Sequence, residues 1–192
     1  MAVAVRKNLG INEWCYGALR QIAAGGPDSV SVEGLARDLG VTKGSFYWHF
    51  ADRAALISSA LEYWAEAATD RTIDDLGRIT DPRRRLRALF RTAATDDRSR
   101  LDVMLATSTG DPGVAMVVER VTGMRLRFLV DAYCELGWSR TTAERQSLIA
   151  YAAYIGHVQL AHALGPDVAR RRMGPAYLDQ IIATLVPPAP PG

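Results

Sequence analysis

The chain has 192 residues, of which 48% are hydrophobic and 23% charged, and a formal net charge of +2. This composition is that of a globular protein with a sizeable core, and it excludes the disordered and collagen-like classes. The weakly basic balance is compatible with a nucleic-acid partner but does not require one. No apolar run reaches the roughly 18 to 20 residues that span a bilayer, and the first residues lack the apolar core of a signal peptide, so we expect a cytoplasmic protein with no membrane partner.

Apolar residues recur at spacings of three and four along almost the whole chain, and no sustained alternation of apolar and polar residues marks a strand. This pattern predicts an all-α fold. A first helix is expected over residues 11–24, ended by the Gly-Gly-Pro segment at 25–27. Ser31 is expected to cap a short second helix that ends at Gly40, because a serine oxygen can accept a hydrogen bond from an unpaired amide of the first helical turn.

Two further polar residues have the position of helix caps. Thr42 is expected to cap a third short helix that runs to about Phe50. Asp52 is expected to cap a longer fourth helix over about residues 53–77.

The later helices have start signals of their own. Asp81 and Asp111 are each followed by proline, and aspartate caps a helix while proline is tolerated at its first position. Thr141 and Glu144 have the spacing of a capping box, which predicts another start at about Thr142. The helices expected in this half of the chain cover residues 82–95, 98–108, 112–136, 142–164 and 175–186.

The second and third helices, with a turn at Gly40, have the spacing of a helix-turn-helix. The segment 32–50, VEGLARDLGVTKGSFYWHF, closely resembles the DNA-binding signature of the TetR repressor family. The resemblance lies in the apolar pair before the turn, the Gly-Val turn, the small residues that open the third helix and the aromatic string Phe-Tyr-Trp-His-Phe. It extends over about residues 11–61, and the rest of the chain agrees with the family in length and helical character.

The resemblance implies two domains. An N-terminal three-helix domain over residues 1–53 would bind DNA, and a helical-bundle domain over residues 54–186 would bind an effector and dimerise. The helix over about 53–77 would link them. Residues 187–192, PPAPPG, are expected to form a flexible tail.

The resemblance also assigns residues that read DNA sequence. It places Lys43, Gly44 and Ser45 at the groove-facing start of the recognition helix, with Trp48 one turn further along. Lysine can donate to guanine, serine can pair with several base edges, and an indole can touch a thymine methyl group. Thr42 is expected to cap this helix, to contact phosphate, or to do both.

Other residues of the segment match positions that contact the DNA backbone. Tyr47 and His49 match family residues that donate to phosphates, which fixes the docking register without reading sequence. Arg53 stands where the family most often has lysine, which implies a phosphate contact with altered geometry. The apolar residues Val41, Phe46 and Phe50 are interpreted as core of the small domain.

The helix over 142–164 is apolar on more than one side, so it requires two partners. A four-helix dimer interface, made by this helix and the last one from each subunit, satisfies that requirement and is what the resemblance implies. The expected interface residues are Ile149, Ala152, Ala153, Gly156, Leu160, Ala163, Leu178, Ile181, Ile182 and Leu185. The alternative is a monomer in which both faces are internal.

Large apolar residues and one histidine on the other helices are candidates for the lining of an effector pocket, with plain core packing as the alternative for each. Their chemistry favours a hydrophobic or aromatic effector. The candidates are Trp64, Phe90, Met104, Phe128, Tyr154 and His157.

Catalytic signatures are missing from the sequence. There is no HExxH, no GxSxG, no phosphate-binding glycine loop and no cysteine with a convincing base. Cys15 and Cys134 have neither a disulfide framework nor a zinc-ligand spacing around them. We therefore predict no enzyme, no cofactor and no metal site.

The predicted function is that of a homodimeric transcriptional regulator. It would repress from a palindromic, double-stranded operator and be released by a small-molecule effector. The alternatives are a helical interaction module that has lost sequence-specific DNA binding, and a regulator that needs no ligand.

Overall fold

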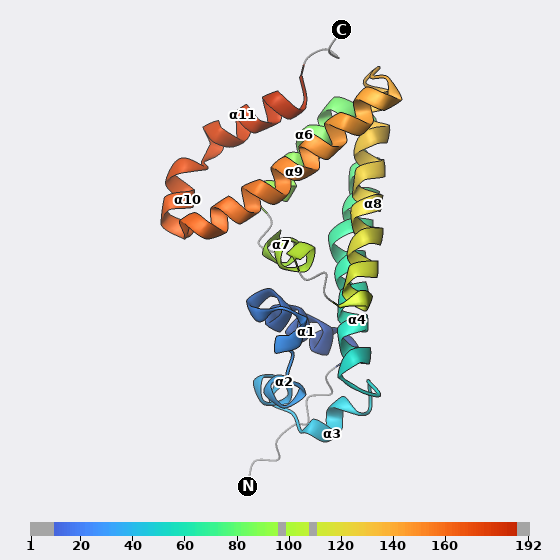
Figure 1. Ribbon diagram of the computed structural model, residues 1–192, viewed down its shortest axis with the longest axis vertical. Coiled ribbons are helices and arrows are strands. Elements are labelled where there is room, and N and C mark those ends of the chain that lie inside the picture. The colour runs from blue at the N-terminus through green and yellow to red at the C-terminus, as the bar shows by residue number, and fades with distance from the viewer. Residues whose placement is uncertain (1–9, 96–98, 108–110, 188–192) are drawn as a thin grey trace. The chain divides into compact units, whose positions relative to one another are not determined.

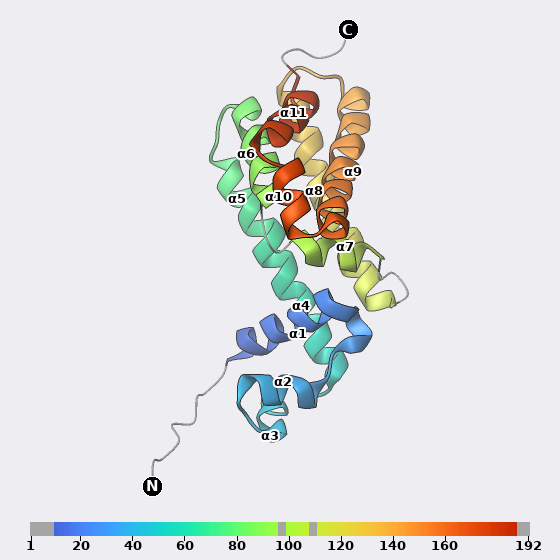
Figure 2. The same cartoon turned by 90° about the vertical axis from the view of Figure 1, so that its left-hand side faces the viewer.

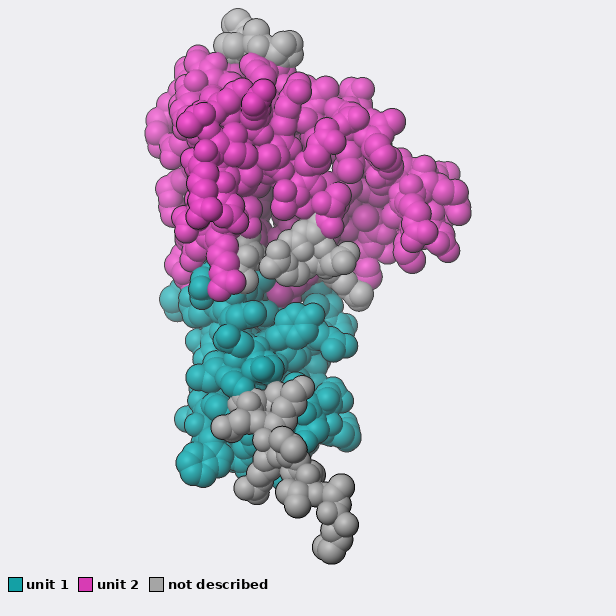
Figure 3. Space-filling view, turned by 180° about the vertical axis from the view of Figure 1, so that it is seen from behind, with its two compact units in different colours: residues 1–67, 104–118 teal, residues 68–103, 119–192 magenta. Residues whose placement is uncertain are grey.

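The computed structural model describes residues 10–95, 99–107 and 111–187 (Figures 1 and 2). Within these ranges the regular elements are helices and none is a strand, which confirms the predicted all-α fold. The chain divides into two compact units (Figure 3). Unit 1 comprises residues 1–67 and 104–118, and unit 2 comprises residues 68–103 and 119–192.

Unit 1 contains the helices that open the chain, and each of them buries apolar side chains. These elements are α1 (Ile11–Gly25), the 3₁₀ turn η1 (Pro27–Ser29), α2 (Val32–Leu39), α3 (Lys43–Phe46) and α4 (Arg53–Ala65). Helix α1 packs against α2 and α4, and α3 packs against α2. The fully buried side chains at their centre are Trp14, Ile22, Leu35, Phe46, Leu56 and Leu61.

Local capping sets the boundaries of α2 and the start of α4. Ser31 Oγ accepts a hydrogen bond from the Gly34 amide at 3.1 Å, and Asp52 Oδ1 accepts one from the Ala55 amide at 2.8 Å, so both predicted caps are confirmed. Gly40 ends α2 with a φ of 70°, the left-handed conformation that favours glycine. These short-range signals were sufficient to place the helix-turn-helix.

The recognition helix is shorter than the sequence predicts. Helix α3 ends at Phe46, and a turn leads from there to Phe50, whose amide donates to the Phe46 carbonyl at 3.0 Å. Thr42 occupies the N-cap position, but its side chain makes no capping hydrogen bond, so this part of the prediction is wrong. The helix therefore depends on the packing of Phe46 rather than on a side-chain cap.

The predicted helix over 53–77 is helical throughout but is not a uniform α-helix. It consists of α4, a π-helical turn η2 (Glu66–Asp70) and α5 (Arg71–Gly77). A π turn inserts one residue into the helix, and such turns are frequent at functional sites. The sequence pattern did not predict it.

The remaining helices follow the predicted boundaries closely, with one addition. They are α6 (Pro82–Thr95), α7 (Ser99–Thr107), α8 (Pro112–Glu135), α9 (Arg140–Leu164), α10 (Pro166–Arg172) and α11 (Pro175–Leu185). Asp81 and Asp111 accept hydrogen bonds from the amides of their first helical turns, as predicted. Helix α10 was not predicted, because Gly165-Pro166 signals the end of one helix and also suits the start of the next.

In unit 2, helix α6 contacts α9 and α11, and α10 contacts α9 (Figure 2). The core between them contains Tyr133, whose hydroxyl donates to the Leu185 carbonyl at 2.8 Å and whose ring lies 5.2 Å from that of Trp138. Ile182 and Leu185 of α11 belong to the same buried cluster. Among the described residues, no helix is both long and apolar enough to cross a membrane.

The start of α9 corrects the predicted capping box. Ser139, rather than Thr141, is the N-cap, and its Oγ accepts from the Thr142 amide at 3.2 Å. A Thr-x-x-Glu spacing is a short motif, and here an equally good cap two residues earlier is used instead.

Ser139→Ala is expected to lower the free energy of unfolding by about 1 kcal/mol, the usual value of a serine cap. Thr141→Ala, at an exposed position one residue inside the helix, is expected to change it by less than about 0.5 kcal/mol. Urea denaturation of the two variants measures both values. Equal losses would place the cap at Thr141.

Candidate functional site

The turn and α3 in unit 1 present several side chains to solvent. Trp48 is 88% exposed and Tyr47 is 59% exposed, both far above what is usual for aromatic residues. Lys43 and Gly44 are exposed as well, and Ser45 is half-buried. The structure thus brings the sequence-predicted base-reading residues together on one short segment.

Lys43 is paired with a carboxylate of the preceding helix. Its Nζ forms a hydrogen-bonded ion pair with Glu33 Oε1, with side-chain exposures of 51% and 64%. The hydrogen bond from Lys43 lowers the pKa of Glu33, and Glu33 raises the pKa of Lys43. Exposed pairs of this kind contribute about 0 to 1 kcal/mol, so Lys43 can exchange Glu33 for another acceptor at small cost.

The protein itself leaves space for a side chain at Gly44. A Cβ atom there would come no closer than 3.6 Å to Thr42 Oγ1, which is ordinary van der Waals contact. Nothing inside the described part of the protein therefore requires glycine at this position.

Tyr47 and His49 flank the buried side of the same segment. The Tyr47 ring packs edge-on against Phe46 at 5.1 Å, and the His49 ring lies 6.2 Å from that of Phe50. Phe46 and Phe50 are themselves buried, at 1% and 5% exposure, which confirms their predicted place in the core. The core thus holds both rings in place, while Tyr47 is exposed to solvent and His49 is half-buried.

Arg53 is engaged inside unit 1. Its Nε donates to the Val30 carbonyl at 2.9 Å and its Nη2 to the Pro27 carbonyl at 2.6 Å. Asp28 lies 3.9 Å from the same guanidinium. These bonds hold the turn before α2 against the start of α4, so Arg53 has a positioning role in the structure. The Arg53 side chain is still 41% exposed, so the expected phosphate contact with altered geometry stays a prediction.

Unit 2 contains a cavity of about 90 Å³. The sequence predicted three of its lining residues, Phe90, Phe128 and Tyr154. His157 instead lines a smaller cavity of about 20 Å³, which shares Phe90 and Tyr154 with the first. Trp64 and Met104 line neither cavity, and Trp64 is buried in unit 1, so the proposed pocket no longer includes them.

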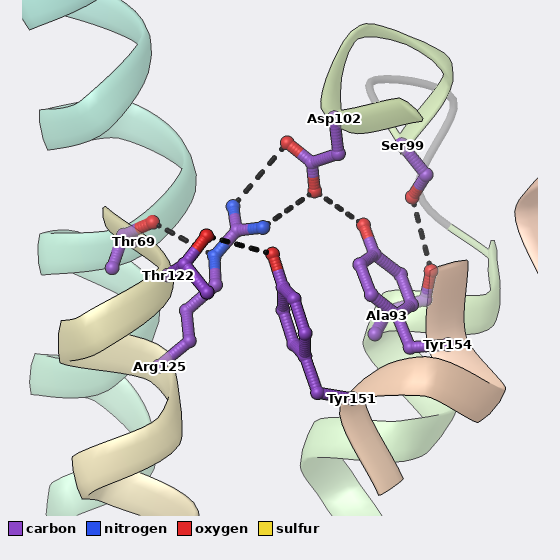
Figure 4. Close-up of polar contacts among 8 residues, drawn as sticks. All are labelled: Thr69, Ala93, Ser99, Asp102, Thr122, Arg125, Tyr151 and Tyr154. Atoms are coloured by element: carbon purple, nitrogen blue, oxygen red, sulfur yellow. Dashed lines mark hydrogen bonds and ion pairs between the residues drawn. The ribbon is translucent and has the colours of Figure 1, made fainter. Parts of the chain in front are cut away.

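Most of the cavity wall is apolar, but a charged pair lies in it (Figure 4). Arg125 Nη1 donates to Asp102 Oδ2 at 2.8 Å and Nη2 to Oδ1 at 3.3 Å. The two side chains are only 15% and 6% exposed. The Tyr154 hydroxyl donates to Asp102 Oδ2, and Arg125 Nε donates to Thr69 Oγ1 at 3.1 Å. Four helical segments therefore meet at one polar cluster.

The charge states of this cluster follow from its burial. Burial lowers the pKa of Arg125, but the charge and hydrogen bonds of Asp102 outweigh it, so the net pKa is raised. Burial, followed by the negative charge of Asp102, raises the pKa of Tyr154. At neutral pH the guanidinium is charged and the tyrosine hydroxyl is not. An apolar cavity with a few convergent polar groups is the usual form of a small-molecule site.

Asp102 and Arg125 are not among the residues predicted from the sequence, although the sequence holds a signal for one of them. Arg125 interrupts an otherwise apolar stripe of α8, which contains the buried residues Val114, Val117, Val121, Leu129 and Ala132. A charge within a buried stripe must have a partner. The stripe could have flagged Arg125, but no local pattern points to Asp102, 23 residues earlier, as that partner.

An exposed apolar face runs along α9 in unit 2. Ile149 is 57% exposed and Leu160 is 47% exposed, and Ala152, Gly156 and Ala163 on the same face are exposed too. Ala153, Leu178 and Ile181 are half-buried. Ile182 and Leu185 are inside the core of their own protomer, so the expected interface is revised to exclude them.

The fold combines a helix-turn-helix in unit 1 with a helical unit 2 that contains a cavity. Residues 17–73 match the family model described as bacterial regulatory proteins, tetR family. The N-terminal part of the chain therefore carries the DNA-binding domain of the TetR family, as its sequence resemblance predicted. No curated protein sequence matches the chain significantly.

Solved structures share this fold along the whole chain. A TetR regulator from Legionella pneumophila is similar with a TM-score of 0.74 and 12% identity, over 96% of this chain and 97% of that one. A TetR-family regulator from Agrobacterium tumefaciens gives a TM-score of 0.73 and 20% identity, over 93% and 94%. AibR, solved with isovaleryl coenzyme A and operator DNA, gives 0.67 and 17%, over 93% and 98%.

Proposed function

We propose that this protein is a homodimeric repressor that binds a palindromic operator and is released from it by a small, largely apolar effector. The observation that carries the proposal is the exposure of Lys43, Gly44, Tyr47 and Trp48 on a buried aromatic support. Exposed aromatic rings are costly unless a partner covers them. AibR, which has the same fold, was solved in complex with isovaleryl coenzyme A and operator DNA, so this fold can hold a small molecule and DNA. A regulator of this kind would work in the cytoplasm.

The proposed contacts divide into those that read bases and those that position the protein. Lys43, Ser45 and Trp48 would face base edges in the major groove, with Gly44 allowing close approach of the backbone. Thr42, Tyr47 and His49 would contact phosphates. Thr42 suits this role because its hydroxyl is not used as a helix cap.

The dimer would form through the exposed face of α9. Ile149, Ala152, Gly156, Leu160 and Ala163 follow one another at spacings of three and four, and their small side chains allow a second helix to pack closely. The half-buried residues Ala153, Leu178 and Ile181 would border it. A two-fold dimer presents two recognition helices, which is why its operator would be palindromic.

Effector binding would reach the helix-turn-helix through Arg125. Arg125 pairs with Asp102, which lines the cavity. Its Nε also donates to Thr69, a residue of the π turn η2 that is only 1% exposed. A ligand that moves the guanidinium would remove a hydrogen bond from the irregular part of the helix that continues into α4. A preference of about 2 to 3 kcal/mol for one of two arrangements would weaken operator binding tens to more than a hundredfold.

Selection of randomised duplex DNA by the ligand-free protein tests the DNA-reading function, with two variants that separate the proposed roles. Tyr47→Phe is expected to weaken binding to all selected sequences roughly tenfold, because it removes a hydrogen bond to a charged phosphate. Lys43→Ala is expected to change the preferred base at one position of each half-site by about 1 to 3 kcal/mol. Fluorescence anisotropy over a range of salt concentrations measures both effects.

Tyr16→Phe is the matched control, because Tyr16 is 57% exposed on α1 of the same unit and lies outside the proposed contacts. A palindromic consensus supports the two-fold dimer. The reverse pattern, with Tyr47→Phe changing sequence preference, would overturn the assignment of roles. Weak binding without sequence preference by folded protein would favour an interaction module that has lost DNA recognition.

A further inference from the structure

The cavity of unit 2 has a specific charge balance and a specific set of hydrogen-bonding atoms. Among the described residues that line it, the ionised side chains are Arg125 and Asp102, and each is hydrogen-bonded to the other (Figure 4). Asp102 also accepts a hydrogen bond from Tyr154, and Arg125 donates its remaining Nε to Thr69. The cavity therefore presents a neutral pair to a ligand.

This pairing disfavours a ligand with a net charge. A carboxylate near Arg125 would lie beside Asp102 as a second negative charge, and an ammonium near Asp102 would lie beside Arg125 as a second positive charge. Both groups are largely withdrawn from water, so neither repulsion is screened effectively. An uncharged ligand leaves the pair intact.

The hydroxyl groups of the wall favour a ligand that itself carries a hydroxyl. Tyr154 gives its proton to Asp102 and Ser99 gives its proton to the Ala93 carbonyl at 3.0 Å, so both oxygens retain lone pairs that can accept. Thr69 Oγ1 accepts from Arg125, and its own proton is left to donate. A ligand hydroxyl that donates to the Tyr154 or Ser99 oxygen fits this side of the wall, and Thr69 lies on the other side of the Arg125 guanidinium (Figure 4).

The rest of the wall suits a single aromatic ring. Phe90, Phe128, Tyr151 and Tyr154 supply ring faces and edges, and the Tyr151 and Tyr154 rings lie 6.2 Å apart. A cavity of about 150 Å³ lined by apolar residues binds benzene. This one measures about 90 Å³, so even a single ring would require the wall to give slightly, and a larger compound would require it to move further.

We propose that the effector of the cavity is an uncharged one-ring or similarly small compound with a hydroxyl group, recognised by Tyr154 and Ser99 and selected against charge by the Asp102–Arg125 pair. This inference rests on the proposed effector-controlled function and names the chemical class of its ligand. Tyr154 and Ser99 are thereby specificity-determining residues.

Four one-ring probes test the proposal by isothermal titration of the full chain at about pH 7, where phenol is neutral, benzoate anionic and benzylamine cationic. Toluene is the probe with the shape of phenol but no hydroxyl. Phenol is expected to bind about three- to tenfold more tightly than toluene. Benzoate and benzylamine are expected to bind at least about a hundredfold more weakly than phenol.

Variants separate the hydrogen-bonding part of the proposal from the charge part. Tyr154→Phe and Ser99→Ala are expected to reduce the advantage of phenol over toluene while toluene binds as before. Asp102→Asn keeps the shape of the wall but removes the carboxylate that pairs with Arg125, and is expected to make benzoate the preferred probe. Tyr177→Phe is the matched control, because Tyr177 bonds His157 and does not line the cavity.

Three outcomes would each overturn the proposal. They are equal affinity of the wild-type protein for phenol and benzoate, equal affinity for phenol and toluene, and no binding of any probe. Operator binding by the ligand-free protein is measured on the same preparation, so that failure of the ligand-class proposal can be told apart from failure of the DNA-reading function. If operator binding is present and the probe pattern is not, the ligand class is wrong and the regulator stands. If the probe pattern is present and operator binding is not, the ligand class is right and the DNA-reading function is wrong.

Discussion

Asp102→Ala is expected to lower the free energy of unfolding by about 3 to 5 kcal/mol, because it leaves the Arg125 guanidinium buried without a counter-charge. Asp102 is 6% exposed and accepts hydrogen bonds from both Arg125 and Tyr154, so few water molecules can replace it. Urea denaturation followed by circular dichroism measures the loss.

Asp179→Ala is the matched control for this prediction. Asp179 pairs with Arg91 at 2.9 Å, but both side chains are more than 60% exposed, at 62% and 65%, so the expected loss is below about 1 kcal/mol. Replacing Asp102 and Arg125 together by leucine and methionine should recover most of the loss, because no charge is then buried. A single Asp102→Ala variant as stable as the control would show that solvent reaches the pair.

Phe46→Ala is expected to destabilise unit 1 by about 3 to 5 kcal/mol and to abolish operator binding. Phe46 is 1% exposed, packs edge-on against Trp14 at 5.6 Å and stacks on Phe50 at 5.5 Å. A helix of one turn has no stability of its own, so α3 depends on this contact. Hydrogen exchange of the amides of α1 to α4, together with fluorescence anisotropy on operator DNA, measures both effects.

Trp48→Ala provides the contrast within the same segment. Trp48 is 88% exposed, so its removal is expected to change stability by less than about 0.5 kcal/mol while operator binding still weakens. If the α3 amides of the Phe46→Ala variant were as protected from hydrogen exchange as those of the wild-type protein, the turn would be held by something other than the aromatic core.

Short-range signals predicted most of the fold. Ser31, Asp52, Asp81 and Asp111 act within three residues of their own position, so sequence alone is sufficient to place the helices that they start. The failures are positions where two local signals compete. Ser139 lies two residues before the capping-box threonine, and Pro166 was interpreted as a stop although proline also opens helices.

The candidate sites divide in the same way. The DNA-facing residues were predicted because they follow one another in a single segment that resembles a known family. Phe90, Phe128 and Tyr154 were predicted for the cavity as large apolar residues on helices. The Asp102–Arg125 pair was not, since it joins α7 to α8 across 23 residues and only tertiary packing brings the two groups together. The π turn was missed because periodicity averages over one inserted residue.

In the proposed function, the Glu33 carboxylate beside Lys43 would weaken binding to DNA outside the operator. A genome offers about a million or more competing sites, so a regulator gains as much from weak attraction to wrong sequences as from strong attraction to the right one. If Lys43 reads a guanine as proposed, Glu33 would neutralise the Lys43 charge until that guanine replaces it, and would repel phosphates until then. In the proposed complex the pair would therefore shorten the time spent on random DNA, because Lys43 would leave Glu33 only where a guanine can accept its hydrogen bond.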